Sequence, residues 1–160
     1  MDDKATNIMN HVVVWIGHDA TLREAVDILA ENIISGLPVV DEAKKVIGII
    51  TERDILEYFD NHNVTPLISS SNWASQHNDV SQIASFRKGF ELMDRTKVEE
   101  VMTQNVVKAD TNTSCSEILS LMKKKNINRL PVVDGEGKLS GIVTRTDILN
   151  YLAEQYNVLR

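Results

Sequence analysis

Apolar residues in the first third of the chain fall into two kinds of pattern. Short unbroken runs at 12–16, 37–40 and 46–50 are typical of buried strands. The turn at 41–45 predicts a hairpin between the last two runs, and a further helix is expected to begin near Thr51. Helical spacing predicts an amphipathic helix after the first run, with an apolar stripe of Leu22, Ala25, Val26, Leu29 and Ile33. The predicted order is β-α-β-β-α.

The same order returns later in the chain. Sliding the sequence by 93 residues aligns 13–56 with 106–149 without a gap, and 16 of the 44 aligned pairs are identical. Met9 also matches Met102. In the second copy the strand is expected at Val106 and Val107, the turn at 134–138, the last helix near Thr144, and the stripe at Cys115, Ile118, Leu119 and Met122. Each copy alone has too few residues for a full core, so we expect the two to pack together.

Residues 59–97 form an insert between the copies. The polar stretch 69–76 predicts a loop. Trp73 within it is either a docking aromatic or a side chain folded onto the nearest apolar surface, and the second reading is preferred. A short amphipathic helix, weakened by Gly89, is predicted from Val80, Ile83, Phe90 and Met93.

Composition and charge exclude several classes of protein. The chain has 160 residues, and its net charge of 17 − 23 = −6 disfavours binding to nucleic acid through a basic face. No apolar run approaches the length of a membrane span. The single cysteine, Cys115, cannot form an internal disulfide, so we expect a reducing, cytoplasmic compartment. We expect no metal site and no enzymatic activity, because the sequence shows no zinc-ligand spacing, nucleophile–base pair or phosphate-binding glycine loop.

Two blocks shared by both copies resemble a known family. Leu-Pro-Val-Val-Asp at 37–41 and 130–134, followed by Gly-Ile-x-Thr-x-x-Asp at 48–54 and 141–147, is similar to the cystathionine beta-synthase (CBS) domain. Two copies in tandem resemble a CBS pair, or Bateman module, with motifs at 5–58 and 98–155. The resemblance implies an α+β fold of two β-α-β-β-α units packed sheet to sheet about a pseudo-twofold axis. Its ligands would be AMP, ADP or ATP first, then S-adenosylmethionine, NADH or cyclic dinucleotides.

The residues themselves favour a phosphorylated nucleoside. Thr51 and Thr144 lie where a strand gives way to a helix, and free N–H groups there favour an anion. Asp54 and Asp147 follow three residues later, and an ionised carboxylate can accept two hydrogen bonds from ribose hydroxyls. The same Thr-x-x-Asp spacing also predicts a helix cap, so both roles stay open. The guanidinium groups of Arg53, Arg129 and Arg145 are candidate phosphate partners.

The family pattern assigns each binding site residues from both copies. The resemblance places Asn7, Val12, Ile34, Ser35, Gly36, Asn128, Arg129, Ile142, Thr144, Thr146 and Asp147 in one site. It places Ile49, Thr51, Arg53, Asp54, Asn105, Ile127, Asn128 and Arg129 in the other. Gly36 stands where the second copy has Arg129, so the site of Asp147 is expected to be the stronger for a phosphorylated ligand.

These observations lead to one preferred function and one rival. We expect a stand-alone regulatory module that binds an adenine nucleotide and signals its occupancy to an effector protein. The rival is a ligand-free scaffold of the same fold. A homodimer is expected, because the last helix of each copy has apolar residues beyond one narrow stripe: Ile55, Leu56, Tyr58 and Phe59, and Ile148, Leu149, Tyr151 and Leu152.

Overall fold

The computed structural model describes residues 3–64 and 80–158, so the 69–76 stretch and Trp73 lie outside the described residues. Its elements include two β-sheets and several helices, which makes it a mixed α+β fold as the sequence predicts. The helices are α1 (Ala5–Ile8), α2 (Leu22–Asn32), α3 (Glu52–Asn61), α4 (Val80–Arg95), α5 (Val98–Val101), α6 (Cys115–Lys125) and α7 (Arg145–Val158). The strands are β1 (Ile16–Gly17), β2 (Gly36–Val40), β3 (Val46–Thr51), β4 (Thr103–Gln104), β5 (Ala109–Asp110), β6 (Arg129–Val133) and β7 (Leu139–Thr144).

The chain divides into two compact units that do not coincide with the sequence repeats. Unit 1 contains residues 1–15, 40–47 and 105–160, and unit 2 contains 16–39 and 48–104. The short helix α1 therefore packs with α6, α7 and β7 of the second repeat, and α5 packs with α3 of the first. The opening segment of each repeat thus completes the core of the other.

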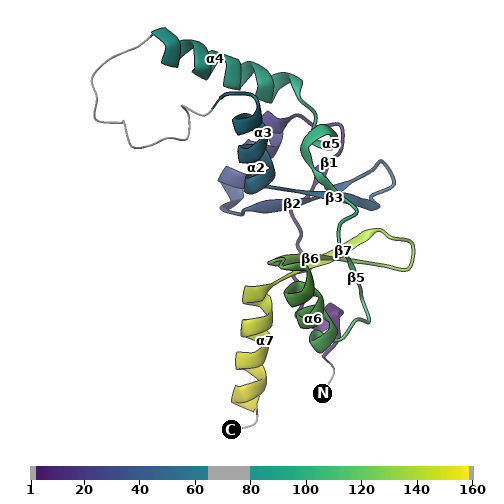
Figure 1. Ribbon diagram of the computed structural model, residues 1–160. Coiled ribbons are helices and arrows are strands. Elements are labelled where there is room, and N and C mark those ends of the chain that lie inside the picture. Colours follow the sequence, from purple (N-terminus) through teal and green to yellow (C-terminus); the bar gives the residue numbers. More distant parts are fainter. Residues whose placement is uncertain (1–2, 65–79, 159–160) are drawn as a thin grey trace. The chain divides into compact units, whose positions relative to one another are not determined.

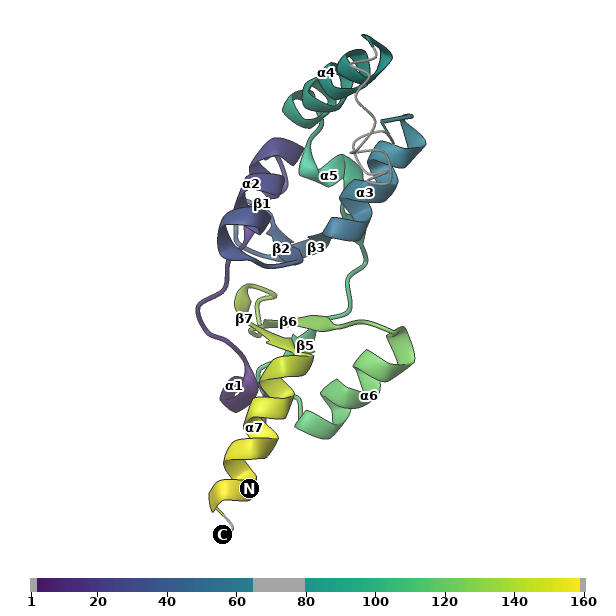
Figure 2. The ribbon, with the colours of Figure 1, turned by 90° about the vertical axis from the view of Figure 1, so that its left-hand side faces the viewer.

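In unit 1, a three-stranded sheet in the order β5-β6-β7 carries its helices on one face. β5 runs parallel to β6, and β6 runs antiparallel to β7. Both views show α1, α6 and α7 on the same side of this sheet (Figures 1 and 2). The core beneath them includes Ile118, Leu130, Val132 and Val143, all fully buried.

In unit 2, a sheet in the order β1-β2-β3-β4 is covered by α2 and α3 (Figure 1). The predicted helix of the insert is α4, and it packs against α2. Leu92 anchors it in the core, whereas Ile83 and Phe90 of the predicted stripe are exposed. The prediction therefore placed the helix correctly, but two residues of its predicted apolar stripe are exposed rather than buried.

Both hairpins form where the turns predict them. Asp41 and Asp134 each accept a backbone hydrogen bond inside the turn through a side-chain oxygen, for example from Lys45 N at 2.9 Å and Lys138 N at 3.0 Å. The two turns also contact each other, since Val46 N donates to Gly137 O at 3.1 Å and Leu139 N to Lys44 O at 3.1 Å. These bonds fix the position of Lys44 within unit 1.

Four sequence predictions need correction. The strand expected at 12–16 is reduced to β1, and the strand expected at Val106 and Val107 lies at β5 instead. Ile33 is not on the buried stripe of α2: it is the C-cap, with a left-handed φ of 53°, and is 93% exposed. Asn126 has the same role after α6, with a φ of 52°. Leu119 is likewise exposed rather than buried.

The described residues contain no helix that is both long and apolar enough to cross a membrane.

Candidate functional site

The Thr144–Asp147 motif closes the N-terminus of α7 in unit 1. Thr144 donates to Asp147 Oδ2 through both its backbone N and its Oγ1, each at 2.7 Å. Asp147 N donates in return to Thr144 Oγ1 at 3.3 Å. The capping prediction is therefore confirmed, and it occupies only one of the two carboxylate oxygens. Within the described ranges, no residue donates a hydrogen bond to Oδ1 of Asp147.

Arg129 lies directly across the ladder from Thr144. The two residues are register partners in the antiparallel β6–β7 pair, so their side chains share a face of the sheet. Arg145 N also donates to Asn128 O at 3.3 Å, which holds the start of α7 against the start of β6. The half-buried residue Arg129 therefore lies on the same face of the sheet as Thr144, whose hydroxyl caps α7.

The N-terminal segment completes this side of unit 1. Asn10 and Ile142 form an isolated antiparallel bridge, with Asn10 N donating to Ile142 O at 2.9 Å and Ile142 N to Asn10 O at 3.1 Å. Asn10 Oδ1 accepts from Val12 N at 3.0 Å, which sets the path of the next residues. Val12 is 83% exposed, so an apolar side chain stands in solvent beside this edge.

The matching motif in unit 2 has a different set of partners. Asp54 Oδ2 accepts from Thr51 N and Thr51 Oγ1, both at 2.8 Å, so the cap is the same. However, Oδ1 of Asp54 accepts a hydrogen bond from Thr103 Oγ1 at 3.1 Å. Both carboxylate oxygens of Asp54 are thus occupied, unlike those of Asp147.

The two candidate phosphate ligands next to the aspartates also differ. Arg53 Nε donates to Glu57 Oε1 at 2.8 Å on the exposed face of α3, and this hydrogen bond raises the pKa of the guanidinium. Arg145 is exposed, and its side chain makes no ion pair with another described residue. Arg145 therefore has a guanidinium available to an anion, whereas Arg53 is already paired with a carboxylate.

The predicted site residues fall into two groups. Unit 1 contains those that surround Asp147, together with part of the set predicted for Asp54: Asn7, Val12, Asn105, Ile127, Asn128, Arg129, Ile142, Thr144, Arg145, Thr146 and Asp147. Unit 2 contains Ile34, Ser35, Gly36, Ile49, Thr51, Arg53 and Asp54. Only Gly36 and Ile49 of these are buried. Most of the set predicted around Asp147 therefore lies within one compact unit.

Two contributors were missed by the sequence interpretation. Asn10 builds the edge beside Ile142, and Thr103 occupies the second oxygen of Asp54. These residues occupy matching places in the repeat, each directly after the methionine that the two copies share. Extending the alignment by one residue past Met9 and Met102 is the signal that would have found them.

Comparison with known proteins identifies the family. Residues 5–61 and 98–154 each match the CBS domain, and the chain therefore belongs to the CBS domain family. A protein of Methanocaldococcus jannaschii, MJ1426, is 36% identical over 150 residues, which is 91% of this chain and 89% of that relative. Other relatives are longer: the chain covers 23% of the inosine-5'-monophosphate dehydrogenase of the same organism, at 35% identity.

Solved structures show the same fold. The CBS domain pair of protein MJ0100, in complex with 5'-methylthioadenosine and S-adenosyl-L-methionine, superposes with a TM-score of 0.68 at 26% identity, covering 93% of this chain and 98% of that one. CBSX2 of Arabidopsis thaliana in complex with AMP has a TM-score of 0.70, covers 96% and 98% of the two chains, and at 21% identity supports the fold alone. CBS pairs of this fold thus include proteins solved with adenosine ligands.

Proposed function

We propose that this chain is a non-enzymatic regulatory CBS pair that binds an adenine nucleotide through the residues around Asp147. The observation that carries the proposal is the carboxylate of Asp147. One oxygen holds the cap of α7, and the other is left to accept hydrogen bonds from ribose hydroxyls. Arg129, Arg145 and the positive end of the α7 dipole supply positive character for a phosphate.

The surroundings of Asp147 suit the rest of the ligand. The exposed side chain of Val12 and the half-buried Ile142 offer apolar surface for a base. AMP, ADP and ATP are the first candidates, and S-adenosylmethionine, NADH and cyclic dinucleotides are the alternatives. Binding would shift the population of chain conformations, and an effector protein would recognise the shifted state.

Thermal unfolding with a panel of these compounds tests the ligand class. A ligand that binds only the folded state stabilises it by about 2.7 kcal/mol at a hundredfold excess over Kd. We expect at least one adenine nucleotide to raise the melting temperature and guanosine monophosphate to raise it less. If no adenine compound at millimolar concentration changes the melting temperature, the ligand-free scaffold becomes the better account.

We further propose that α7 forms a homodimer face. Leu149, Leu152 and Tyr156 are spaced three and four residues apart on one side of α7 and are 65%, 51% and 59% exposed. Such a row of large apolar side chains is typical of a protein contact surface. Ile55, Phe59 and Ile148 of the face predicted from sequence belong to the core instead, because they are buried.

Analytical ultracentrifugation measures the oligomeric state directly. At micromolar concentration we expect the chain to sediment as a dimer, and Leu149→Glu with Leu152→Glu to sediment as a monomer, because two charges would have to be buried. Asn150→Glu is the control: it adds a single glutamate to an exposed position on another side of α7 and should leave the dimer intact. A wild-type monomer would contradict the proposed dimer face.

A further inference from the structure

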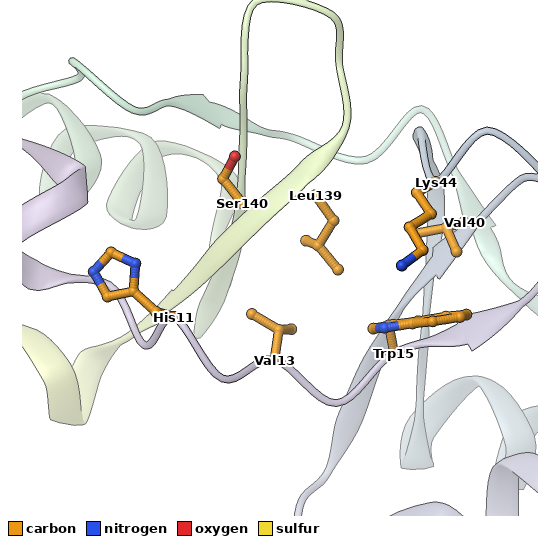
Figure 3. Close-up of a pocket in the computed structure, with 7 residues that line it drawn as sticks. All are labelled: His11, Val13, Trp15, Val40, Lys44, Leu139 and Ser140. Carbon is orange, nitrogen blue, oxygen red and sulfur yellow. The ribbon is translucent and has the colours of Figure 1, made fainter.

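A small cavity in unit 1 is lined by residues that the nucleotide proposal does not use. Its volume is about 140 Å³, and Figure 3 shows the side chains around it. The lining consists of His11, Val13, Trp15, Val40, Lys44, Leu139 and Ser140. Because none of these belongs to the set around Asp147 or Asp54, the cavity is a separate candidate site.

Three segments of unit 1 build the cavity. Positions 11, 13 and 15 contribute alternate side chains, as the period of an extended segment requires, while Val12 between them is not part of the lining. The hairpin turn contributes Lys44, and the start of β7 contributes Leu139 and Ser140. The hydrogen bond from Leu139 N to Lys44 O, at 3.1 Å, joins the last two segments.

The backbone of Lys44 has a conformation that is unfavourable for a residue with a side chain. Its φ of 61° lies in the left-handed region, and the matching residue of the second copy is Gly137, with a φ of 80°. A side chain at such a position costs stability relative to glycine. Lys44 is nevertheless present, and its Nζ stands 5.4 Å from the centre of the Trp15 ring. Residues with a strained backbone conformation cluster at binding sites, where the strain is tolerated because the side chain has a role.

The chemistry of the lining is apolar in the middle and cationic at one end. Figure 3 shows Val13 and Leu139 between His11 on one side and the Trp15–Lys44 pair on the other. Trp15 is 43% exposed, although its indole lies under the Lys44 amine. None of the seven lining residues is acidic, in a chain whose net charge is −6. His11 Nε2 donates to Thr6 O at 3.0 Å, which fixes the imidazole at the rim.

We propose that this cavity binds a small aromatic monocarboxylate. A cavity of about 150 Å³ accommodates a benzene ring, so the observed volume suits one ring. The ring would lie on Val13 and Leu139 beside the indole, and the carboxylate would accept a hydrogen bond from Lys44 Nζ. The proposal does not depend on the nucleotide site, and the two can fail separately.

Tryptophan fluorescence with benzoate as the probe tests the proposal. The chain has two tryptophans, so Trp73→Phe leaves Trp15 as the single reporter. At constant ionic strength, we expect a saturable change in Trp15 emission. Lys44→Met keeps the apolar stem over the indole, removes the charge, and should weaken benzoate binding about tenfold or more. Lys45→Met, one residue along the same turn, is the matched control and should bind as the parent does.

Two further arms separate the possible outcomes. Benzyl alcohol, which lacks the carboxylate, should bind at least as weakly as benzoate binds to Lys44→Met. Asp147→Asn should leave the benzoate response unchanged. Trp15 emission that falls linearly with benzoate concentration, and equally in all variants, would overturn the proposal. So would equal benzoate affinity in Lys44→Met and the parent, or loss of benzoate binding in Asp147→Asn. A benzoate-dependent rise in the melting temperature of the unaltered chain gives the same test without Trp73→Phe.

Discussion

Asp147→Asn is expected to abolish most nucleotide binding while leaving the fold nearly intact. An asparagine oxygen can still accept from Thr144 N, but an amide group then replaces the second acceptor oxygen. Losing hydrogen bonds to a charged acceptor costs about 1.5–3 kcal/mol, which corresponds to roughly a 10- to 100-fold weaker Kd. The loss of negative charge in the first turn of α7 costs about 0.3–1 kcal/mol of stability. The loss of stability is measured from the melting curve of the free protein, and the loss of affinity from the shift of that curve with AMP.

Glu117→Gln is the matched control for this prediction. Glu117 has the same capping position in α6, where its Oε2 accepts from Ser114 N and Ser114 Oγ at 2.9 Å each. The change therefore removes the same kind of charge from the same kind of cap, outside the predicted set. We expect a small loss of stability and an unchanged AMP affinity. Equal AMP affinity in Asp147→Asn and the parent would show that Asp147 acts as a cap alone.

Gly141→Ala is expected to destabilise unit 1 by about 2 kcal/mol. A Cβ at this position would press into the side chain of Met9 and stand 3.1 Å from Asn10 O. Met9 is buried, and Asn10 makes both hydrogen bonds of the bridge to Ile142, so the new methyl group cannot be accommodated without moving this segment. Overpacking of this kind costs about 1–3 kcal/mol. For a chain of this size, we expect a melting temperature lower by roughly 4–8 °C.

Gly135→Ala provides the comparison. No heavy atom lies within 4 Å of a Cβ built at Gly135, in the turn before β7. Alanine there should be neutral, or stabilising by about 0.4–1 kcal/mol, because it restricts the unfolded chain. If Gly141→Ala melts at the same temperature as Gly135→Ala, the contact between Met9 and β7 is not as close as the structure indicates.

The sequence predicts those parts of the structure that local interactions decide. Both Thr-x-x-Asp motifs form caps, because their partners lie three residues apart and need no distant contact. Both hairpins form because Asp41 and Asp134 bond to their own turns. The repeated motifs are enough to identify the family, and the family implies most of the architecture.

Features that depend on distant residues could not be predicted in this way. Thr103 donates a hydrogen bond to Asp54 although the two residues are 49 positions apart, and no local sequence pattern predicts that contact. The exposed position of Ile33 follows from the left-handed end of α2, which an apolar stripe does not reveal. The exchange of α1 and α5 between the repeats depends on tertiary packing, and each helix has only four residues, too few for a periodic signal.

Calorimetric titration with AMP tests the central proposal most directly, because it counts binding sites as well as measuring affinity. Both oxygens of Asp54 are occupied by protein donors, whereas Asp147 keeps one oxygen free of described partners, and Arg129 lies opposite the threonine of the Asp147 motif. We therefore predict one tight site per chain, lost in Asp147→Asn and retained in Asp54→Asn. A tight site that survives Asp147→Asn and disappears in Asp54→Asn, or the absence of any binding heat, would contradict the account.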